Sequence, residues 1–219
     1  MEKEQLEALA AQLGNPSGEK GIEVAEMMNE TNIGMTKNSI SNLQLAAGDS
    51  ILELGHGNAG HLDFLLSQSN DLHYTGLEIS TLMHEEAKQL NRNAFESGKA
   101  RFLLYDGEKM PLEADTVDKV FTVNTIYFWK DPKMVFSELS RILKPNGTLA
   151  LTFAHRSFME MLPFTAFGFT LYNPDEILEI ISGTNFQLDR ADEQTEVVKT
   201  KTGESVERFF STLVLKNKL

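Results

Sequence analysis

The sequence contains no cysteine among its 219 residues. This absence excludes disulfide bonds, thiolate metal sites and a cysteine nucleophile. We expect no metal site. A chain without cysteine suits a reducing compartment, so we expect the protein to work in the cytoplasm.

The sequence also lacks a basic patch. Its 20 Lys and Arg residues stand against 32 Asp and Glu residues, which gives a net charge of -12. Such a charge repels nucleic-acid phosphates and anionic lipid headgroups. The most basic stretch contains Lys199, Lys201 and Arg208, but Glu204 and Glu207 interrupt it. We therefore expect no nucleic-acid partner.

Long hydrophobic runs are absent as well. No segment approaches the roughly 18 apolar residues of a membrane span, and the acidic start MEKEQLEALAAQLGNP has no apolar core of signal-peptide type. We expect no membrane span. With 219 residues and 41% hydrophobic content, the chain is long enough for one sizeable core and short for two. We expect a single domain without repeats or linkers, and the sequence leaves monomer and homodimer open.

Helix and strand patterns alternate along the chain. Leu6, Leu9 and Leu13 recur at helical spacing, and a second helical region over 18–45 is predicted to break near 32–34. The following alternation predicts parallel strands joined by right-handed crossovers, with helices on both faces of a doubly wound α/β sheet. Its predicted strands are 49–55, 73–80, 100–106, 118–128 and 148–153, and its predicted helices are 62–68, 81–95 and 134–143.

The carboxyl-terminal part follows a different pattern. Asn173 is predicted to cap a helix that has Pro174 at its first position and Glu176 at its third. Two strands follow, over 186–199 and 205–216, with the turn residues Thr202 and Gly203 between them. Because the connection is short, we expect these two strands to be antiparallel.

A glycine-rich turn follows the first strand of the alternating series. Gly55, Gly57 and Gly60 in ILELGHGNAGHL spell G-x-G-x-x-G. Glycines let the backbone approach a ligand closely, and the amino terminus of the next helix faces that ligand. The same spacing serves NAD-type dinucleotides, and a near relative of it serves S-adenosylmethionine, so the glycines leave the ligand open.

Two acidic residues end the next strands. Glu78 ends the second strand, 23 residues after Gly55, where a carboxylate can accept hydrogen bonds from both hydroxyls of an adenosine ribose. It also argues against a 2′-phosphorylated ligand, because two anions would meet there. Asp106, followed by Gly107, ends the third strand and can accept a hydrogen bond from an adenine amino group, although Asp-Gly is also an ordinary turn pair.

At this point the sequence resembles a known family. ILELGHGNAG resembles motif I of the class I S-adenosylmethionine-dependent methyltransferases, in which an acidic residue stands two positions before Gly-x-Gly, as Glu53 stands before Gly55. Three further segments resemble the family in the same order: GLEIS, YDGEKMPLEADTVDKV and RILKPNGTLALTF. The resemblance covers residues 49–154, about half of the chain, and is most similar to the small-molecule methyltransferases typified by those of quinone biosynthesis.

The sequence departs from the family pattern at three positions. Ala59 stands where the third motif I glycine usually falls, and Gly60 follows it. His56 separates the first two glycines, and we expect its side chain to face solvent rather than the methionine end of the cofactor. Asn146 replaces the first glycine of Lys-Pro-Gly-Gly, where asparagine tolerates a left-handed turn.

The resemblance implies a seven-stranded, mostly parallel sheet of order 3-2-1-4-5-7-6 with the last strand antiparallel. It implies one methyltransferase domain over 1–219, with a helical cap over 1–48, a cofactor-binding core over 49–154, and an acceptor-side insertion, helix and strand pair over 155–219. S-adenosylmethionine would be the cofactor and S-adenosylhomocysteine the product. The implied cofactor site comprises Glu53, Gly55, His56, Gly57, Asn58, Glu78, Ile79, Asp106, Gly107 and Asn124.

Acceptor recognition is expected outside the resemblance, and the acceptor is expected to be a small molecule. Asn124-Thr125-Ile126-Tyr127 faintly echoes the Asn-Pro-Pro-Tyr motif of amino-group methyltransferases, but both prolines are absent. The segment SFMEMLPFTAFGFTLY, over 157–172, is read as a lid on an apolar substrate or as ordinary core. The expected acceptor-binding residues are Met28, Met35, Tyr127, Trp129 and His155.

No catalytic residue stands out from the sequence. His155 is a candidate general base only because it follows the fifth strand, and Tyr127 is the other candidate. In-line transfer from a sulfonium needs chiefly alignment, so a missing triad is no objection.

Two alternatives remain at this stage. An NAD(H)-binding or flavin-binding oxidoreductase would use the same glycine turn and Glu78, but it does not explain Glu53, Asp106 or the K-P-N-G segment. A protein that binds S-adenosylmethionine without catalysis is not excluded either, because transfer needs no diagnostic residue.

Overall fold

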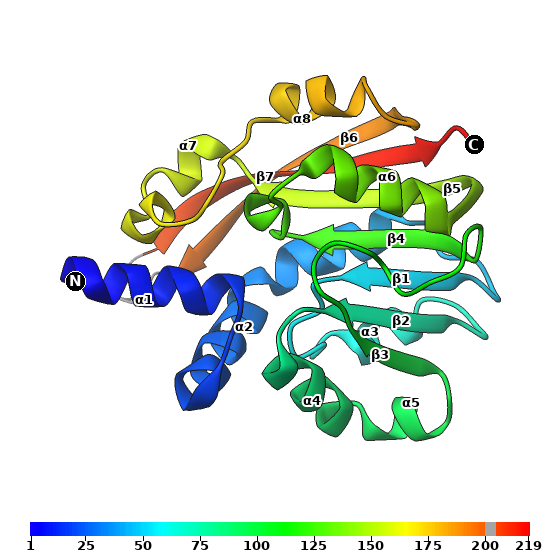
Figure 1. Cartoon of the computed structure of the whole chain (residues 1–219), viewed down its shortest axis with the longest axis horizontal. Coiled ribbons are helices and arrows are strands. Elements are labelled where there is room, and N and C mark those ends of the chain that lie inside the picture. The colour runs from blue at the N-terminus through cyan, green and yellow to red at the C-terminus, as the bar shows by residue number, and fades with distance from the viewer. Residues whose placement is uncertain (200–204) are drawn as a thin grey trace.

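The computed structural model describes residues 1–199 and 205–219. In this part of the chain the strands form one seven-stranded sheet of order β3-β2-β1-β4-β5-β7-β6 (Figure 1). The predicted α/β class and strand order are therefore confirmed. The strands are β1 (Ser50–Leu54), β2 (His73–Glu78), β3 (Ala100–Leu104), β4 (Val117–Val123), β5 (Leu143–Ala154), β6 (Phe186–Lys199) and β7 (Ser205–Asn217).

The sheet changes its direction of growth at β1. This strand pairs in parallel with β2 on one side and with β4 on the other, so the loops after β1 and β4 diverge from one point at the carboxyl edge. In open α/β sheets such a switch point is where ligands bind. β7 runs antiparallel to both β5 and β6, as the sequence predicts. The predicted turn at Thr202 and Gly203 lies outside the described residues.

Helices cover both faces of the sheet. α6 and α8 pack on one face, and α2, α3 and α4 pack on the other. The helical elements are α1 (Lys3–Gly14), α2 (Gly18–Asn42), α3 (Leu62–Leu66), α4 (Thr81–Leu90), α5 (Arg92–Glu96), η1 (Ile126–Phe128), α6 (Pro132–Ile142), α7 (Arg156–Met159), η2 (Pro163–Ala166) and α8 (Pro174–Ile181). Within the described residues, no helix is long and apolar enough to cross a membrane.

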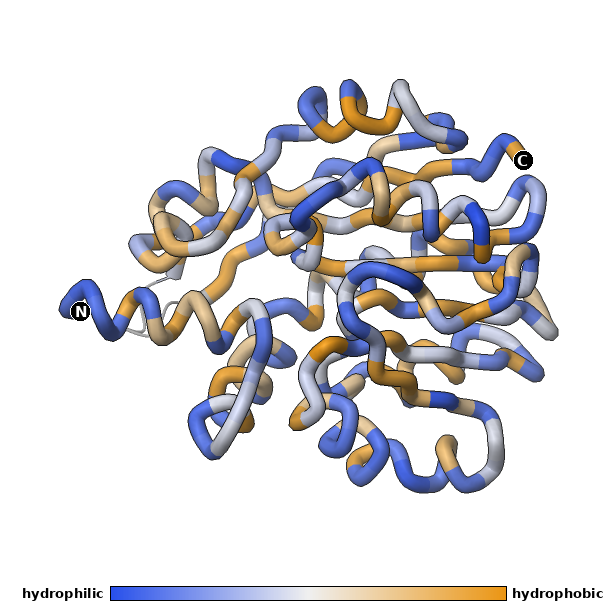
Figure 2. The backbone as a smooth tube through the Cα atoms, viewed as in Figure 1, coloured by the Kyte–Doolittle hydropathy of each residue, from blue (hydrophilic) through white to orange (hydrophobic). Residues whose placement is uncertain are grey.

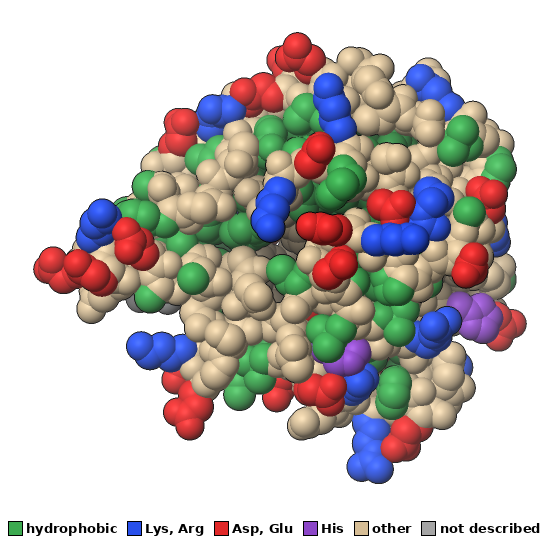
Figure 3. Space-filling view, in the orientation of Figure 1, with side chains coloured by type: hydrophobic (Ala, Val, Ile, Leu, Met, Phe, Trp, Pro, Cys, Tyr) green, Lys and Arg blue, Asp and Glu red, His purple; other side chains and the backbone are tan. Residues whose placement is uncertain are grey.

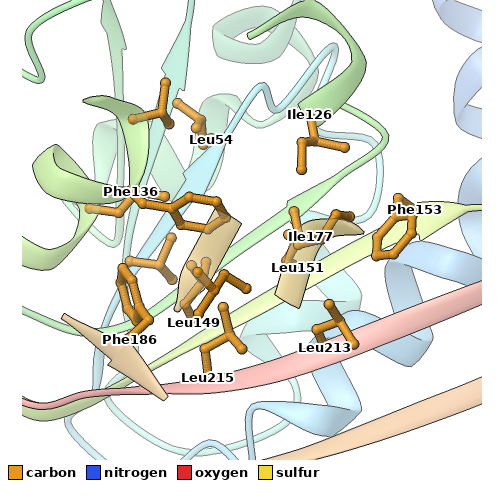
Figure 4. Packing of buried hydrophobic residues seen from close by; sticks show 14 of the residues in the cluster. Leu54, Ile126, Phe136, Leu149, Leu151, Phe153, Ile177, Phe186, Leu213 and Leu215 are labelled. Carbon is orange, nitrogen blue, oxygen red and sulfur yellow. The ribbon is translucent and has the colours of Figure 1, made fainter. Parts of the chain in front are cut away.

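The core follows the alternation of side chains along the strands. Hydrophobic residues run along the central strands in Figure 2, and the more distant α4 and α5 are largely hydrophilic. Figure 4 shows Leu149, Leu151 and Phe153 of β5 pointing to the same side as Leu213 and Leu215 of β7. Each such leucine, fully buried, contributes about 1.5–3 kcal/mol to stability.

The capping signal at Asn173 correctly predicts the start of α8. Asn173 and Glu176 form a capping box at α8, in which Oε2 of Glu176 accepts the backbone N–H of Asn173 at 2.7 Å. Pro174 occupies the first turn of this helix, as predicted.

Two helix predictions are wrong. α2 is a single helix of 25 residues that runs through the predicted break at 32–34. The predicted helix over 81–95 instead divides into α4 and α5 at Asn91. The Asn91 side chain donates hydrogen bonds to the carbonyl oxygens of Ala87, at 3.0 Å, and Ala59, at 3.2 Å, which ties the end of α4 to the glycine turn.

The strands β4 and β5 also differ from their predicted limits. β4 ends at Val123 because Asn124 adopts a left-handed conformation with φ of 57°. β5 begins at Leu143 and includes the predicted K-P-N-G turn as an irregularity in its pairing with β4. Asn146 has the left-handed φ, 62°, that was expected of it.

Candidate active site

A cavity of about 860 Å³ opens at the carboxyl ends of β1, β2, β3 and β4. Its volume lies within the range typical of small-molecule sites. One half is lined by the loops that follow these strands. The other half lies between α1, α2, η1 and the segment from α7 to η2. Figure 3 shows hydrophobic side chains gathered between α1 and this segment.

The glycine turn forms the floor of the first half. Gly55 has φ of 76°, and a Cβ at this position would lie 2.5 Å from Cγ2 of Thr125. Gly57 has φ of 55°, and a Cβ there would meet nothing within 4 Å, so its backbone faces open space. Glycine is needed at position 60 for a different reason, because a Cβ there would lie 2.8 Å from Nδ2 of Asn29 in α2. The first two glycines therefore shape the cavity, and the third accommodates α2.

Glu78 connects the end of β2 to this turn. Its carboxylate accepts backbone N–H groups from Gly57 at 3.0 Å, Ile79 at 2.8 Å and Ser80 at 3.0 Å. Burial raises its pKa, and these three hydrogen bonds oppose that shift. The carboxylate borders the cavity, and its Oε2, which accepts only the Gly57 N–H, has a lone pair left for a ribose hydroxyl.

Glu53 lies beneath the turn and is held by side chains. Its Oε2 accepts the hydroxyl of Tyr74 at 2.5 Å and lies 2.8 Å from Nε2 of His61. All three side chains are buried, and burial together with the Glu53 charge raises the pKa of Tyr74. Glu53 reaches the cavity wall, but its main contacts brace the turn from below.

The predicted orientation of His56 is wrong. Its side chain is 4% exposed and does not face solvent. The ring packs on Phe102 with a centroid distance of 5.2 Å and occupies the space that a side chain at Gly76 would need. Its Nδ1 donates to the Gly57 carbonyl oxygen at 2.7 Å, and its Nε2 has no hydrogen-bond partner among the described residues. Burial lowers the pKa of His56 to about 4.

Asp106 and Gly107 lie at the far end of the first half, after β3. Oδ1 of Asp106 accepts the backbone N–H groups of Glu108 at 2.9 Å and Lys109 at 3.1 Å, and these hydrogen bonds lower its pKa. Its second oxygen is free of described partners. The exposed side chain of Ile79 lies beside Gly107, whose φ is 85°. A flat heteroaromatic ring fits between such an apolar side chain and a carboxylate.

Asn124 stands where the two halves of the cavity meet. Its Oδ1 accepts the backbone N–H of Ala154 at 3.2 Å and lies 3.1 Å from the Tyr127 hydroxyl. Its Nδ2 donates to Oδ1 of Asn32 at 3.3 Å and approaches Sδ of Met35 at 3.5 Å. Both the oxygen and the nitrogen of the amide are thus engaged by neighbouring groups. Asn124 therefore borders the cavity as a bracing residue.

The remaining predicted acceptor residues divide into three groups. Met28 and Trp129 line the cavity, and Tyr127 reaches it with a hydroxyl that donates to the Ala154 carbonyl oxygen at 2.8 Å. Met35 is fully buried beneath it. His155 does not border the cavity, because its Nε2 is hydrogen-bonded to the Ser211 hydroxyl at 2.7 Å. Its position gives the general-base hypothesis no support.

Other residues of the second half were missed by sequence reasoning. Leu6, Leu9 and Leu13 of α1 line it, as do Asn32 of α2 and Arg208 of β7. The helical spacing of the leucines marked an apolar face, but the sequence did not indicate what that face covers. The positions of Asn32 and Arg208 depend on contacts between residues 176 positions apart.

The residues of the first half fit the S-adenosylmethionine that the sequence resemblance implies. A buried carboxylate, an open glycine backbone and an acidic residue beside an apolar side chain match its ribose, its aminoacyl chain and its adenine. Glu53, Gly55, His56, Gly57, Asn58, Glu78, Ile79, Asp106, Gly107 and Asn124 all border this cavity. Across 1–199 and 205–219, no group of three or more His, Asp or Glu side chains is placed to hold a metal ion.

Comparisons with known proteins agree with this geometry. Residues 52–151 match the family described as a methyltransferase domain. The chain is 33% identical over 118 residues to the uncharacterized methyltransferase YdaC of Bacillus subtilis, covering 54% of this chain and 63% of that protein. It is 28% identical over 124 residues to the 27-O-demethylrifamycin SV methyltransferase of Amycolatopsis mediterranei, covering 57% and 45%. The chain thus spans less than two thirds of the length of these curated relatives.

A solved structure extends the similarity to nearly the whole fold. The chain superposes with a TM-score of 0.74 and 18% identity on a chain from the Haloferax volcanii complex between the Trm112 methyltransferase activator and a methyltransferase. The match covers 98% of this chain and 97% of that one. At this identity the similarity concerns the fold.

Proposed function

We propose that this chain, whose residues 52–151 match the methyltransferase domain family, is a class I S-adenosylmethionine-dependent methyltransferase that transfers a methyl group to a small molecule with an apolar body. The observation that carries the proposal is the continuous cavity. It runs from the glycine turn, past Asn124, into a compartment lined by α1, η1 and the α7–η2 segment. The first half suits the cofactor, and the second half is left for the acceptor.

In the proposed cofactor site, Glu78 accepts a ribose hydroxyl, and the Gly57 backbone lies along the aminoacyl chain. Asp106 accepts the adenine amino group, and Ile79 packs on the ring. Glu53 and His56 act from beneath, since both are buried under the turn that they support. The proposed division of the chain is a cap over 1–48, a cofactor core over 49–154 and an acceptor side over 155–219.

The cofactor, when bound, supplies a methyl group on a positively charged sulfur that is already a good leaving group. In the transfer, the sulfur–methyl bond breaks with its electron pair going to sulfur, a bond forms between the methyl carbon and the acceptor, and the acceptor proton goes to solvent. The protein's part is to align the two molecules and exclude water, and alignment is worth up to ~7–11 kcal/mol in favourable cases. The buried Tyr127 and Phe158 help to exclude water from this junction.

The acceptor is proposed to be small because the largely apolar cavity of about 860 Å³ must hold it together with the cofactor. The chain's net charge of -12 disfavours a nucleic-acid acceptor. The absence of cysteine supports action in the cytoplasm. Light scattering on the purified chain distinguishes a monomer from a homodimer.

Calorimetric titration with S-adenosylhomocysteine, S-adenosylmethionine and NAD tests the cofactor. We expect the first two to bind and NAD not to bind. Glu78→Gln removes the charge and an acceptor oxygen, so we expect about a tenfold or greater loss of S-adenosylhomocysteine affinity. Glu179→Gln, on the exposed surface of α8, is the matched control and should bind normally. Binding of NAD alone would contradict the proposal.

Transfer of radiolabelled methyl into a cell extract tests the acceptor class. We expect label in the fraction that an organic solvent extracts, and none retained by the Glu78→Gln variant. Label confined to precipitated protein or RNA would refute the small-molecule assignment. Binding of the cofactor without transfer to any fraction would identify a non-catalytic binding protein.

A further inference from the structure

One polar cluster interrupts the apolar half of the cavity. It consists of Asn32 of α2, Asn124, Glu196 of β6 and Arg208 of β7, and we call it the Asn32 cluster. β6 and β7 extend past the ends of β4 and β5 to α1 (Figure 1), which brings Arg208 to the cavity wall. Although charged, Arg208 is only 5% exposed.

The charge of Arg208 is already compensated. Its Nε and Nη2 donate to Oε1 of Glu196 at 3.1 and 2.7 Å, and Nη2 also donates to the Thr31 carbonyl oxygen. Room for Glu196 comes from Gly34, since a Cβ at that position would overlap Oε2 of Glu196. A glycine within a helix costs about 1 kcal/mol relative to alanine. The glycine thus lowers the stability of the helix slightly, and it makes room for an ion pair of Arg208 and Glu196, without net charge, beside the cavity.

The orientation of the Asn32 amide follows from donors that cannot act as acceptors. The Ala154 backbone N–H fixes the oxygen of Asn124, so the Asn124 nitrogen faces Asn32. Nη1 of Arg208, which can only donate, also faces Asn32 at 3.0 Å. The atom of Asn32 that both groups contact must therefore be its oxygen.

This orientation leaves the amide nitrogen of Asn32 available. It has no hydrogen-bond partner among residues 1–199 and 205–219, and Asn32 is half-buried and borders the cavity. Around it the acceptor half is lined by side chains such as Met28, Phe128, Phe158 and Val206. A fixed N–H donor in an apolar wall selects the polar group of whatever binds there.

We infer that Asn32 binds the methyl acceptor and that the acceptor presents a neutral oxygen, a hydroxyl on an apolar skeleton, to its amide nitrogen. This inference rests on the proposed function. A protonated amine has no lone pair with which to accept this N–H, and a neutral aromatic amine accepts poorly because its lone pair is delocalised into the ring. A carboxylate meets a pair, Arg208 and Glu196, whose charges already cancel, so its burial is uncompensated.

Three biphenyls that differ only in their polar group test the inference by calorimetry on protein saturated with S-adenosylhomocysteine. They are 4-phenylphenol, 4-aminobiphenyl and biphenyl-4-carboxylic acid. We expect the phenol to bind about tenfold more tightly than the other two, which corresponds to one hydrogen bond.

Asn32→Ala is the decisive variant. It removes the free donor and adds no acceptor, so we expect phenol affinity to fall about tenfold and the preference for the phenol to disappear. Asn32→Asp keeps an oxygen for Arg208 and Asn124 and puts a second acceptor in place of the free donor. Because the phenol O–H can donate to that acceptor, we expect the phenol to lose less affinity than in Asn32→Ala. Asn93→Asp makes the same chemical change on exposed α5 and should leave all three affinities unchanged.

The outcomes separate the two claims. Failure of the unmodified protein to bind S-adenosylhomocysteine, measured before any biphenyl is added, overturns the proposed function. Normal S-adenosylhomocysteine binding without preference for the phenol, or with none of the three probes bound, overturns the inference alone. The same holds if Asn32→Ala binds the cofactor product normally and keeps its phenol affinity.

Discussion

His56 shows how one side chain links the glycine turn to the acidity of the solution. Its ring is enclosed by Phe102 and the backbone of Gly76, and burial lowers its pKa from 6.5 to about 4. Between these two values the unfolded chain binds a proton that the folded chain does not. Stability is therefore present above pH 6.5 and is lost as the pH falls toward 4, by about 3 kcal/mol for such a shift.

Replacement of His56 by asparagine tests this linkage. The amide nitrogen can still donate to the Gly57 carbonyl oxygen, but the side chain no longer titrates. We expect urea unfolding at several pH values from 7 to 5 to show a flatter decline in the free energy of unfolding for His56→Asn than for the unmodified chain. Parallel declines would show that other groups cause the acid sensitivity.

At the scale of elements, Gly34 of the helix α2 leaves space for the side chain of Glu196 in the strand β6. Gly34→Ala would ordinarily stabilise a helix by up to about 1 kcal/mol. Here the new Cβ overlaps the carboxylate of Glu196, which can move away only by disturbing its hydrogen bonds from the buried Arg208, so we expect a loss of about 1–3 kcal/mol in the free energy of unfolding. Urea denaturation measures it.

A double-mutant cycle assigns the cause. In a Glu196→Ala background the overlap disappears, and Gly34→Ala is expected to be neutral or stabilising. Glu196→Gln, which keeps the size of the side chain, should retain the penalty. An equal effect of Gly34→Ala in all three backgrounds would exclude Glu196 as its cause.

Element types were predictable where a local pattern decides them. The alternating strands and the capping box at Asn173 needed only neighbouring residues, and both are confirmed. The predicted break in α2 failed because Arg208 of β7 holds the Asn32 side chain, and because Gly34 leaves room for Glu196 of β6 within a continuous helix. The division between α4 and α5 depends on a hydrogen bond from Asn91 to Ala59, 32 residues away.

At the scale of the whole molecule, the cavity residues that could be predicted from the sequence are those that follow a local motif. The residues that border its first half were predictable because a local motif follows each strand, as with Glu78 after β2. The acceptor half combines segments that are distant in sequence, and His155 was included for its place after β5 although its ring turns to Ser211. Asn32 and Arg208 were missed because only the folded chain brings them together.

α1 belongs to the cavity more than to the core. Among its residues only Ala10 is buried, and Leu6, Leu9 and Leu13 line the acceptor half. We therefore expect Leu9→Ala to lower the free energy of unfolding by less than about 1 kcal/mol, well below the 1.5–3 kcal/mol of a fully buried leucine. Binding of 4-phenylphenol to the S-adenosylhomocysteine complex should weaken several-fold.

Leu90→Ala, at a leucine of α4 that is 60% exposed, is the matched control and should change neither quantity. Calorimetry and urea denaturation provide both measurements. A large loss of stability in Leu9→Ala with unchanged phenol binding would place α1 in the core instead.

The two halves of the cavity draw mainly on different parts of the chain. The glycine turn, Glu78, Asp106 and Asn124 all fall within 52–151, the range that matches the methyltransferase domain family, as does η1 of the second half. The other elements of the second half, α1, α2, the α7–η2 segment and Arg208, flank that range. Under the proposed function, mutations in the flanks are expected to alter acceptor binding and to leave cofactor binding unchanged. Such a layout lets descendants of one ancestral gene acquire new acceptors by diverging at both ends, and it directs protein engineers to the same two regions.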